Sequence, residues 1–239
     1  MTAENTDNID SDRDSTSKNK LNSLRAAVLG ANDGIVSVAS IVLGVAGATN
    51  NRGTIFTAGL AGLVAGAMSM AVGEYVSVSS QRDSEKAFIA LEKIHLKQHP
   101  DVEFNELVDN YQDKGLSAKT ARQVASELTS HNAVQAHLEI EMNLEEDDLI
   151  NPLVAAITSL VAFSIGAIIP LVTIVLASQS IHLIATVIAV IIALIIIGYL
   201  SATVGKAPRL RAISRVIIGG ALAMLITYGI GRLFGTAIH

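Results

Sequence analysis

Apolar residues fall into five long stretches, which are separated by short polar turns and, in one place, by a longer polar segment. The stretches cover residues 24–48, 55–79, 150–176, 181–204 and 213–236. A helix needs about 20 mostly apolar residues to cross the hydrocarbon core of a membrane. The pattern therefore predicts an all-α membrane protein with five transmembrane helices.

The longer polar segment, residues 81–148, predicts a three-helix cytosolic insert between spans two and three. Its first helix continues the second span to about Gln98, and the second begins after Pro100 and ends before Gly115. The third opens at an N-cap serine, Ser117, and runs to about residue 144 with a bend near Asn132. Local sequence signals thus predict where each helix of the insert begins and ends.

Charge supports a division into four parts. Residues 149–239 contain no Asp or Glu, whereas the insert holds 15 acidic residues against 7 Lys or Arg. The first twenty residues are polar and predict a disordered cytosolic tail. The expected domains are the tail (1–20), spans one and two (21–80), the insert (81–148) and spans three to five (149–239).

Lys and Arg gather on one side of the predicted spans. They precede span one, follow span two and fill the loop between spans four and five, residues 205–215. Because cytosolic loops carry an excess of Lys and Arg, this pattern predicts a cytosolic N-terminus and insert, with the C-terminus outside.

Two acids lie inside apolar sequence, Asp33 in span one and Glu74 in span two. A carboxylate near the bilayer centre costs about 2.5–3.5 kcal/mol on insertion scales, and such residues usually mark an ion or proton path. Met70 lies one helical turn before Glu74 and adds a thioether to the same face. We therefore expect Asp33, Met70 and Glu74 to line a path for a divalent ion, with the carboxylates able to exchange protons for the cation. Met70 taken alone is more simply read as ordinary helix packing.

The insert offers carboxylate and imidazole side chains at the spacing of metal ligands. Glu-x-x-His and Glu-x-x-Glu pairs project two ligands from one helix face, as in the carboxylate-bridged metal sites of helical bundles. The candidate ligands are Glu92, His95, Glu103, Glu106, His137, Glu139, Glu141 and Glu145. A solvated acidic face explains any single pair equally well, and the choice between Glu139 and Glu141 stays open.

Other classes of function find little support. The chain has no cysteine, which excludes disulfides and thiolate metal sites. We find no Ser-His-Asp arrangement, phosphate-binding loop or histidine box, so we do not expect an enzyme. We also expect no tightly bound cofactor and no nucleic-acid partner. Besides a transporter, a membrane-anchored metal sensor or store is an alternative function. That alternative does not explain Asp33, because spans that only anchor a protein do not need an acidic residue deep in the membrane.

The motifs NDGIVS (residues 32–37) and GEYVSV-x-x-QRD (residues 73–83) resemble those of the vacuolar iron transporter family. The resemblance implies a homodimer of five-helix subunits that exports Fe²⁺, and often Mn²⁺, from the cytosol in exchange for protons. It also implies a cytosolic metal-binding domain at the place of the insert. Asp33, Met70 and Glu74 then fall on the transport path. Glu92, Glu103 and Glu106 fall on glutamate-rich helices, and the end of the third insert helix completes the metal site.

Two residues depart from that family pattern. His95 stands where the resemblance implies a second glutamate, and His137 stands near an expected methionine or glutamate. Imidazole can bind Fe²⁺, Mn²⁺ and Zn²⁺, so the ion selectivity and the stoichiometry of the insert are open and Zn²⁺ is a further candidate. The first residues resemble no organelle-targeting extension, from which we expect a bacterial plasma membrane rather than a vacuole.

Overall fold

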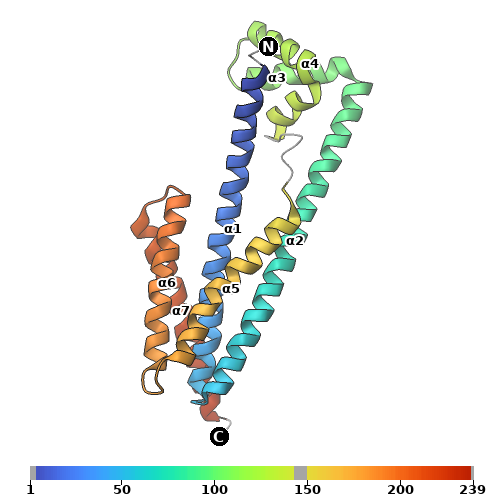
Figure 1. Cartoon of the computed structure of the whole chain (residues 1–239). Coiled ribbons are helices and arrows are strands. Elements are labelled where there is room, and N and C mark those ends of the chain that lie inside the picture. Colours follow the sequence, from blue (N-terminus) through green and yellow to red (C-terminus); the bar gives the residue numbers. More distant parts are fainter. Residues whose placement is uncertain (1–3, 143–149, 238–239) are drawn as a thin grey trace. The chain divides into compact units, whose positions relative to one another are not determined.

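The computed structural model describes the backbone of residues 4–142 and 150–237, and the side chains of residues 24–142 and 150–235. All regular structure in these ranges is helical (Figure 1). The helices are α1 (Glu4–Ala48), α2 (Arg52–Gln98), α3 (Pro100–Asp113), α4 (Ala118–His137), the π-helix η1 (Leu138–Met142), α5 (Pro152–Leu176), α6 (His182–Val204) and α7 (Arg209–Ala237).

The predicted fold class is confirmed. In the described part of the chain, α1, α2, α5, α6 and α7 each contain a segment long and apolar enough to cross a membrane. Short helices lie between the second and third of these segments. The chain forms two compact units: a membrane unit of residues 1–76 and 152–239, and an insert unit of residues 77–151.

α1 begins earlier than the sequence predicts. Its first residue is Glu4, so the helix includes most of the segment for which polar composition predicts disorder. Starting a helix fixes several residues for one hydrogen bond, whereas extending an existing helix gains one hydrogen bond for each residue fixed, so extension costs less conformational entropy per hydrogen bond. The apolar helix that begins near Leu24 can therefore be continued backward by residues that would not form a helix alone.

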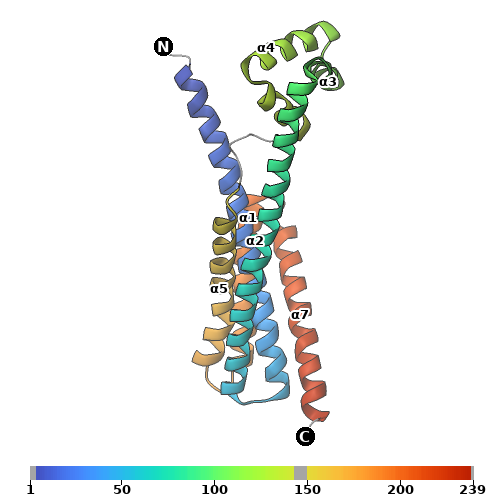
Figure 2. The same ribbon diagram turned by 90° about the vertical axis from the view of Figure 1, so that its right-hand side faces the viewer.

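α1 is the central element of the membrane unit and packs against α5, α6 and α7 (Figures 1 and 2). On one side, Val38 and Val42 of α1 pack with Phe163 of α5 and Ile55 of α2. On another side, a second apolar cluster joins α1 to α6 and α7 through Ile35, Ala39, Leu43, Val190, Leu194 and Met224. Burial of α1 on several faces thus holds the unit together.

Glycines let α1 approach its neighbours backbone to backbone. A Cβ atom at Gly34 would overlap the carbonyl oxygen of Phe163, and one at Gly166 would overlap the carbonyl oxygen of Ala31. The contact with α7 is built in the same way, since a Cβ at Gly231 would overlap the carbonyl oxygen of Gly44. Small residues at helix contacts are the usual means of close packing in membranes, where burial of apolar surface gives little driving force.

At one end of the unit, the α1–α2 turn is tied to the α5–α6 turn. The Arg52 guanidinium donates hydrogen bonds to the carbonyl oxygens of Val175 at 3.1 Å and Ala177 at 2.5 Å. These carbonyls lie at the C-terminal end of α5, where a cation is favoured by the helix dipole. Gln179 donates back to the carbonyl of Asn50 at 3.1 Å. The two turns are therefore held together by three described hydrogen bonds, two of which come from the charged Arg52 side chain.

The insert unit begins its helices where the sequence predicts. Pro100 stands in the first turn of α3, and the Ser117 hydroxyl accepts a hydrogen bond from the Thr120 amide at the start of α4. Gly115 has a φ of +99°, which a residue with a side chain rarely adopts. A small core packs α3 on α4 through Leu107, Val108, Ala121, Ala125 and Ala136.

We predict that Gly231→Ala destabilises the protein while Gly229→Ala does not. The first substitution places a methyl group on the backbone of α1, and overpacking of this kind costs about 1–3 kcal/mol. The second lies on the same helix with nothing within 4 Å of its Cβ position. Melting temperatures of the two purified full-length variants in one detergent measure the difference. Equal shifts in both would contradict a backbone contact between α1 and α7.

Candidate metal centre

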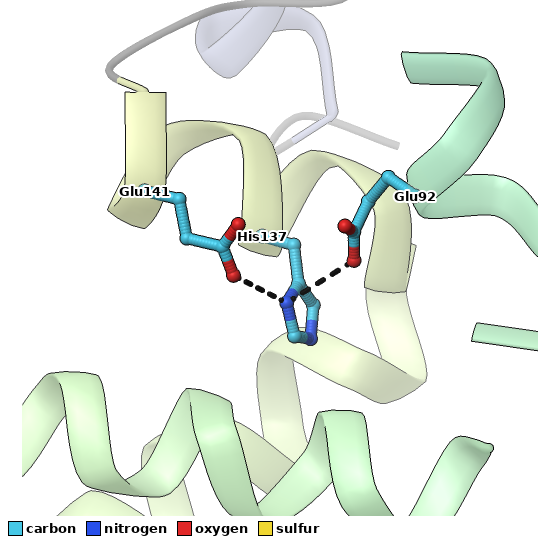
Figure 3. Close-up of side chains that lie close together, drawn as sticks. All are labelled: Glu92, His137 and Glu141. Atoms are coloured by element: carbon cyan, nitrogen blue, oxygen red, sulfur yellow. Dashed lines mark hydrogen bonds and ion pairs between the residues drawn. The ribbon is translucent and has the colours of Figure 1, made fainter. Parts of the chain in front are cut away.

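Three carboxylates surround one ring nitrogen of His137 in the insert unit, and Figure 3 shows two of them, Glu92 and Glu141. Nδ1 lies 3.0 Å from Oε1 of Glu141, 3.3 Å from Oε1 of Glu92 and 4.0 Å from Oε2 of Glu103. Glu92 comes from α2, Glu103 from α3, His137 from the end of α4 and Glu141 from η1. One ligand atom each from Glu92, His137 and Glu141 lie within 4.8 Å of one another, close enough to share a metal ion.

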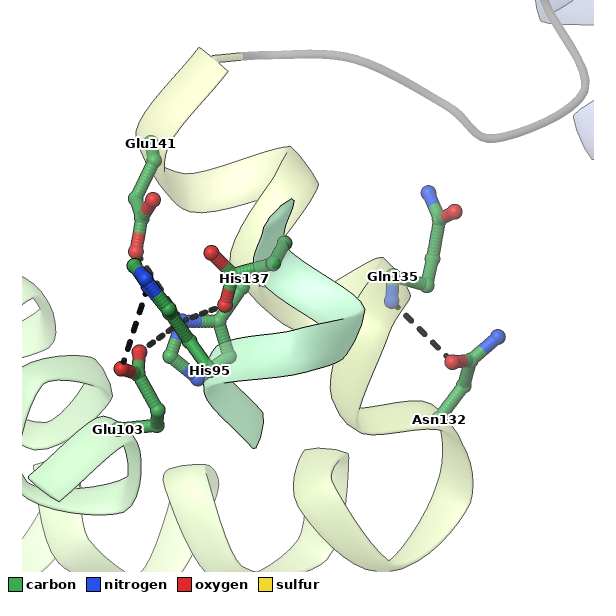
Figure 4. A network of polar contacts seen from close by, with 7 residues as sticks. His95, Glu103, Asn132, Gln135, His137 and Glu141 are labelled. Carbon is green, nitrogen blue, oxygen red and sulfur yellow. Dashed lines mark hydrogen bonds and ion pairs between the residues drawn. The ribbon is translucent and has the colours of Figure 1, made fainter. Parts of the chain in front are cut away.

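A break within α4 brings His137 to this position. Asn132 has non-helical backbone angles (φ −157°, ψ 95°), which confirms the predicted bend. Its side-chain oxygen accepts a hydrogen bond from the Gln135 amide at 3.1 Å, as an N-cap residue does (Figure 4). The last turn of α4 is thus restarted in a new direction. Leu138, which directly follows His137, is fully buried and anchors that turn.

Three of the four residues of the cluster are buried, and its three carboxylates carry more negative charge than one imidazole can balance. The relative solvent exposure is 5% for Glu92, 7% for Glu103 and 0% for His137. Nδ1 carries at most one proton, and the nearest acceptor is Glu141. Oε1 of Glu92 is accordingly buried without a hydrogen bond in the described residues. A buried charge without a partner is costly, and a divalent cation among the three carboxylates would remove that cost.

Burial raises the pKa of Glu92 above its ordinary value. The negative charges of Glu141 and Glu103 raise this pKa further, while His137 and His95 act in the opposite direction. The same surroundings that make the ionised carboxylate unfavourable make it a strong ligand once a cation is present, because a bound ion supplies the missing positive charge.

The remaining candidate ligands lie outside the centre of the cluster. His95 is at its edge, with Nδ1 3.8 Å from Glu103 and a side chain that stays 45% exposed (Figure 4). Glu106 is exposed on α3, and none of the described ion pairs ties it to His137. Glu139 accepts a hydrogen bond from Gln135 at 2.9 Å. Partial burial raises the pKa of Tyr111, and the charge of Glu139 raises it further, so Glu139 faces away from the cluster. Glu145 lies outside the described residues.

Glu141, rather than Glu139, therefore joins His137. The two lie four residues apart and project to the same side, which the spacing of the sequence already favoured. No signal in the sequence predicted the π-helix that carries Glu141. π-Helical turns are rare and occur frequently at functional sites.

The structure places the three residues of the expected transport path in the membrane unit. Asp33 is exposed on α1, and its Oδ1 accepts a hydrogen bond from the Ser37 hydroxyl at 2.7 Å. Met70 packs against the cluster of α1, α2 and α5, and Glu74 is half-buried on α2. Among the described hydrogen bonds and ion pairs none joins Asp33 to Glu74, so their shared role stays a prediction.

Five membrane-spanning helices, acids within two of them and a buried carboxylate–imidazole cluster between the second and third define a class of protein, the polytopic metal-ion transporters. Comparison with known proteins agrees with this class. The model of the VIT (vacuolar iron transporter) family matches residues 24–232. The chain therefore belongs to the VIT family, as its motifs predicted, and it is an integral membrane protein of a transporter family, not an enzyme.

Relatives match over most of the chain. It is 42% identical to a vacuolar iron transporter of Acanthamoeba castellanii, over 89% of this chain and 79% of that protein. It is 36% identical to vacuolar iron transporter homolog 3 of Arabidopsis thaliana, over 100% of this chain and 98% of that protein. Homolog 2 from the same plant is 34% identical, over 95% and 94% of the two chains. The similarity thus extends through the insert as well as the spans.

We predict that Glu141→Gln weakens divalent-metal binding by the full-length protein, by about 10-fold or more, whereas Glu139→Gln does not. The first change removes a charge 3.0 Å from His137, and the second removes one that faces away. Isothermal titration with Zn²⁺ in detergent measures both. Equal losses would mean that overall negative charge, rather than this cluster, holds the ion.

We predict that Glu92→Gln stabilises the metal-free insert at neutral pH. A carboxyl group whose pKa is raised on folding contributes stability below its unfolded value, near 4.5, and loses it as pH rises through the folded value. The neutral amide does not undergo this loss. Amide hydrogen-exchange protection of residues 100–137 in the full-length protein, compared between pH 5 and pH 8, measures the effect.

Two controls accompany this measurement. In the wild type, a metal ion at 100 times its dissociation constant should add about 2.7 kcal/mol, because it binds only the folded insert. In Glu92→Gln that gain should largely vanish. A variant that lost protection in the absence of metal would contradict the view that Glu92 is unfavourable without an ion.

Proposed function

We propose that this protein carries Fe²⁺ across its membrane out of the cytosol, and that the insert collects the ion. The observation that carries the proposal is the cluster of Glu92, Glu103, His137 and Glu141, of which the first three are buried. The proteins similar to this chain over most of its length are named vacuolar iron transporter or vacuolar iron transporter homolog. Carboxylate and imidazole together are a donor set that suits Fe²⁺. Mn²⁺, which has the same charge but is better suited to oxygen ligands, is a second and weaker substrate in this proposal.

Asp33 and Glu74 are the residues proposed to pass the ion through the membrane. An ionised carboxylate inside a span is retained only where it has a partner, and Ser37 gives Asp33 one hydrogen bond at 2.7 Å. A passing cation supplies a stronger partner, and a proton can take its place when the ion leaves. This alternation is the physical basis on which we propose exchange of the metal ion for protons.

Orientation and assembly complete the proposal. The Lys and Arg pattern supports an N-terminus, insert and 205–215 loop in the cytosol, where the insert meets its ions. The functional unit is a homodimer. The relatives are named vacuolar, whereas we expect a bacterial plasma membrane for this chain. Fractionation of the native cell tests that expectation directly.

The test is ion uptake by purified protein in sealed vesicles. We expect Fe²⁺ transport that is accelerated by an opposing proton gradient. Asp33→Asn keeps a side-chain oxygen for Ser37 but removes the charge, and should lower the rate by about 10-fold or more. Glu85→Gln is the control, since that acid is only half-buried and its Oε1 accepts a hydrogen bond from Gln81.

Each outcome has a separate meaning. Transport that ignores the pH gradient would remove proton exchange from the proposal. Transport that survives Asp33→Asn would remove the proposed path. Metal binding without any transport would favour the alternative, a membrane-anchored metal sensor or store.

A further inference from the structure

His137 presents one nitrogen to oxygen ligands from three helical segments. The oxygens of Glu141, Glu92 and Glu103 lie 3.0, 3.3 and 4.0 Å from Nδ1. An ion held by these carboxylates therefore meets one nitrogen and several oxygens. The other nitrogen, Nε2, points away into the interior, where it has no hydrogen bond within the described residues.

The imidazole is fixed in this position. His137 is 0% exposed, and its chain neighbours Ala136 and Leu138 are 4% and 0% exposed. Close-packed interiors leave no room for a ring of this size to swing aside. His95 differs, because its side chain remains 45% exposed and can turn toward water. An ion bound by Glu92 and Glu141 is thus obliged to accept nitrogen from His137.

We propose that His137 sets the ion preference of the insert, so that its site selects Fe²⁺, Co²⁺ and Zn²⁺ over Mn²⁺, Mg²⁺ and Ca²⁺. The proposal rests on the metal-collecting role given to the insert above. Imidazole nitrogen suits the later transition metals, whereas carboxylate and water suit Mg²⁺, Ca²⁺ and Mn²⁺. A site in which the nitrogen cannot be avoided therefore discriminates against the second group.

The partnerless Nε2 adds a second property to this site. A metal-binding imidazole usually donates its other N–H to a carboxylate or carbonyl, and loss of that partner typically costs 10–100-fold in affinity. In the described residues His137 has no such partner. The site accordingly selects its ion by donor type but does not hold it as tightly as a supported imidazole would, which suits a collector that must release its ion.

The test compares ion affinities of full-length wild type, His137→Glu and His95→Glu by calorimetric titration with Co²⁺ and Mn²⁺. Affinity rises from Mn²⁺ to Co²⁺ in most sites, so the change of the ratio between variants is the informative quantity. His137→Glu should lower the Co²⁺/Mn²⁺ affinity ratio about 10-fold or more, with Mn²⁺ binding retained. His95→Glu should change it by less than about twofold, because its ring lies at the edge of the cluster.

A structural role for His137 predicts a different result. If the ring only fills space, His137→Glu weakens Co²⁺ and Mn²⁺ alike and leaves their ratio unchanged, which overturns the proposal. Glu92→Gln calibrates this outcome, since loss of a shared oxygen ligand should weaken both ions together. Circular dichroism of each variant establishes that the helices are intact.

X-ray absorption of Co²⁺ bound to the wild-type protein gives a readout that needs no variant. The spectrum should contain the multiple scattering of one imidazole ring, and this signal should be absent in His137→Glu. If that variant fails to fold, His137→Gln replaces it, and the wild-type spectrum still decides. A shell of oxygen atoms alone in the wild type overturns the proposal.

Failure of this proposal and failure of the proposed transport are distinguishable. If the protein transports Fe²⁺ but its Co²⁺/Mn²⁺ affinity ratio does not depend on residue 137, the proposed transport stands and the proposed role of His137 in ion preference is wrong. If the affinity ratio changes with residue 137 but the protein transports no ion, the role of His137 in ion preference stands and the proposed transport is wrong.

Discussion

The close backbone contact between α1 and its neighbours is the constraint on which the membrane unit depends. Apolar side chains gain little by leaving lipid for one another, so helix association there relies on contact area and small residues. Gly34 against Phe163, Gly166 against Ala31 and Gly231 against Gly44 supply that contact on two sides of α1. With α1 placed in this way, the NDGIVS segment that carries Asp33 and Ser37 lies on the helix that packs with most of the unit. The polar residues proposed for transport thus stand on the best-supported element.

In the insert unit, by contrast, the buried polar residues oppose the stability of the fold. Its apolar core is small, and its most buried polar residues are ones that the unit would be more stable without. Burial opposes the charged form of Glu92, yet the helices bring Glu92, Glu103 and Glu141 to the same ring nitrogen. A cation bound among these carboxylates would offset this cost at neutral pH. Occupancy of the site would then add to the stability of the unit, and the affinity for the ion would be linked to folding.

Much of this could be predicted from sequence because the determining signals are local. Five apolar stretches predicted the spans, and Pro100, Gly115 and Ser117 predicted the helix ends of the insert. All four residues of the cluster were among the candidates. Spacing alone could not show that Glu106 and Glu139 face elsewhere, since this depends on how three helices pack and on the π-helix after His137. The sequence did not predict that α1 begins at Glu4, because polar composition does not show whether a segment continues a stable helix that follows it.

The two histidines show how ion preference can change without any change in the fold. His95 and His137 both stand where the family resemblance implies other residues, but packing gives them unequal weight, because one side chain is 45% exposed and the other is fully buried. A side chain at the edge of the cluster that can turn toward water leaves the ion to its other ligands, whereas a ligand that cannot move imposes its chemistry on every ion that enters. Burial, rather than ligand identity alone, converts His137 from an optional donor into a selective one. In the proposed function the insert collects the ion, so a change of ligand in the insert would alter ion preference without any change in the spans.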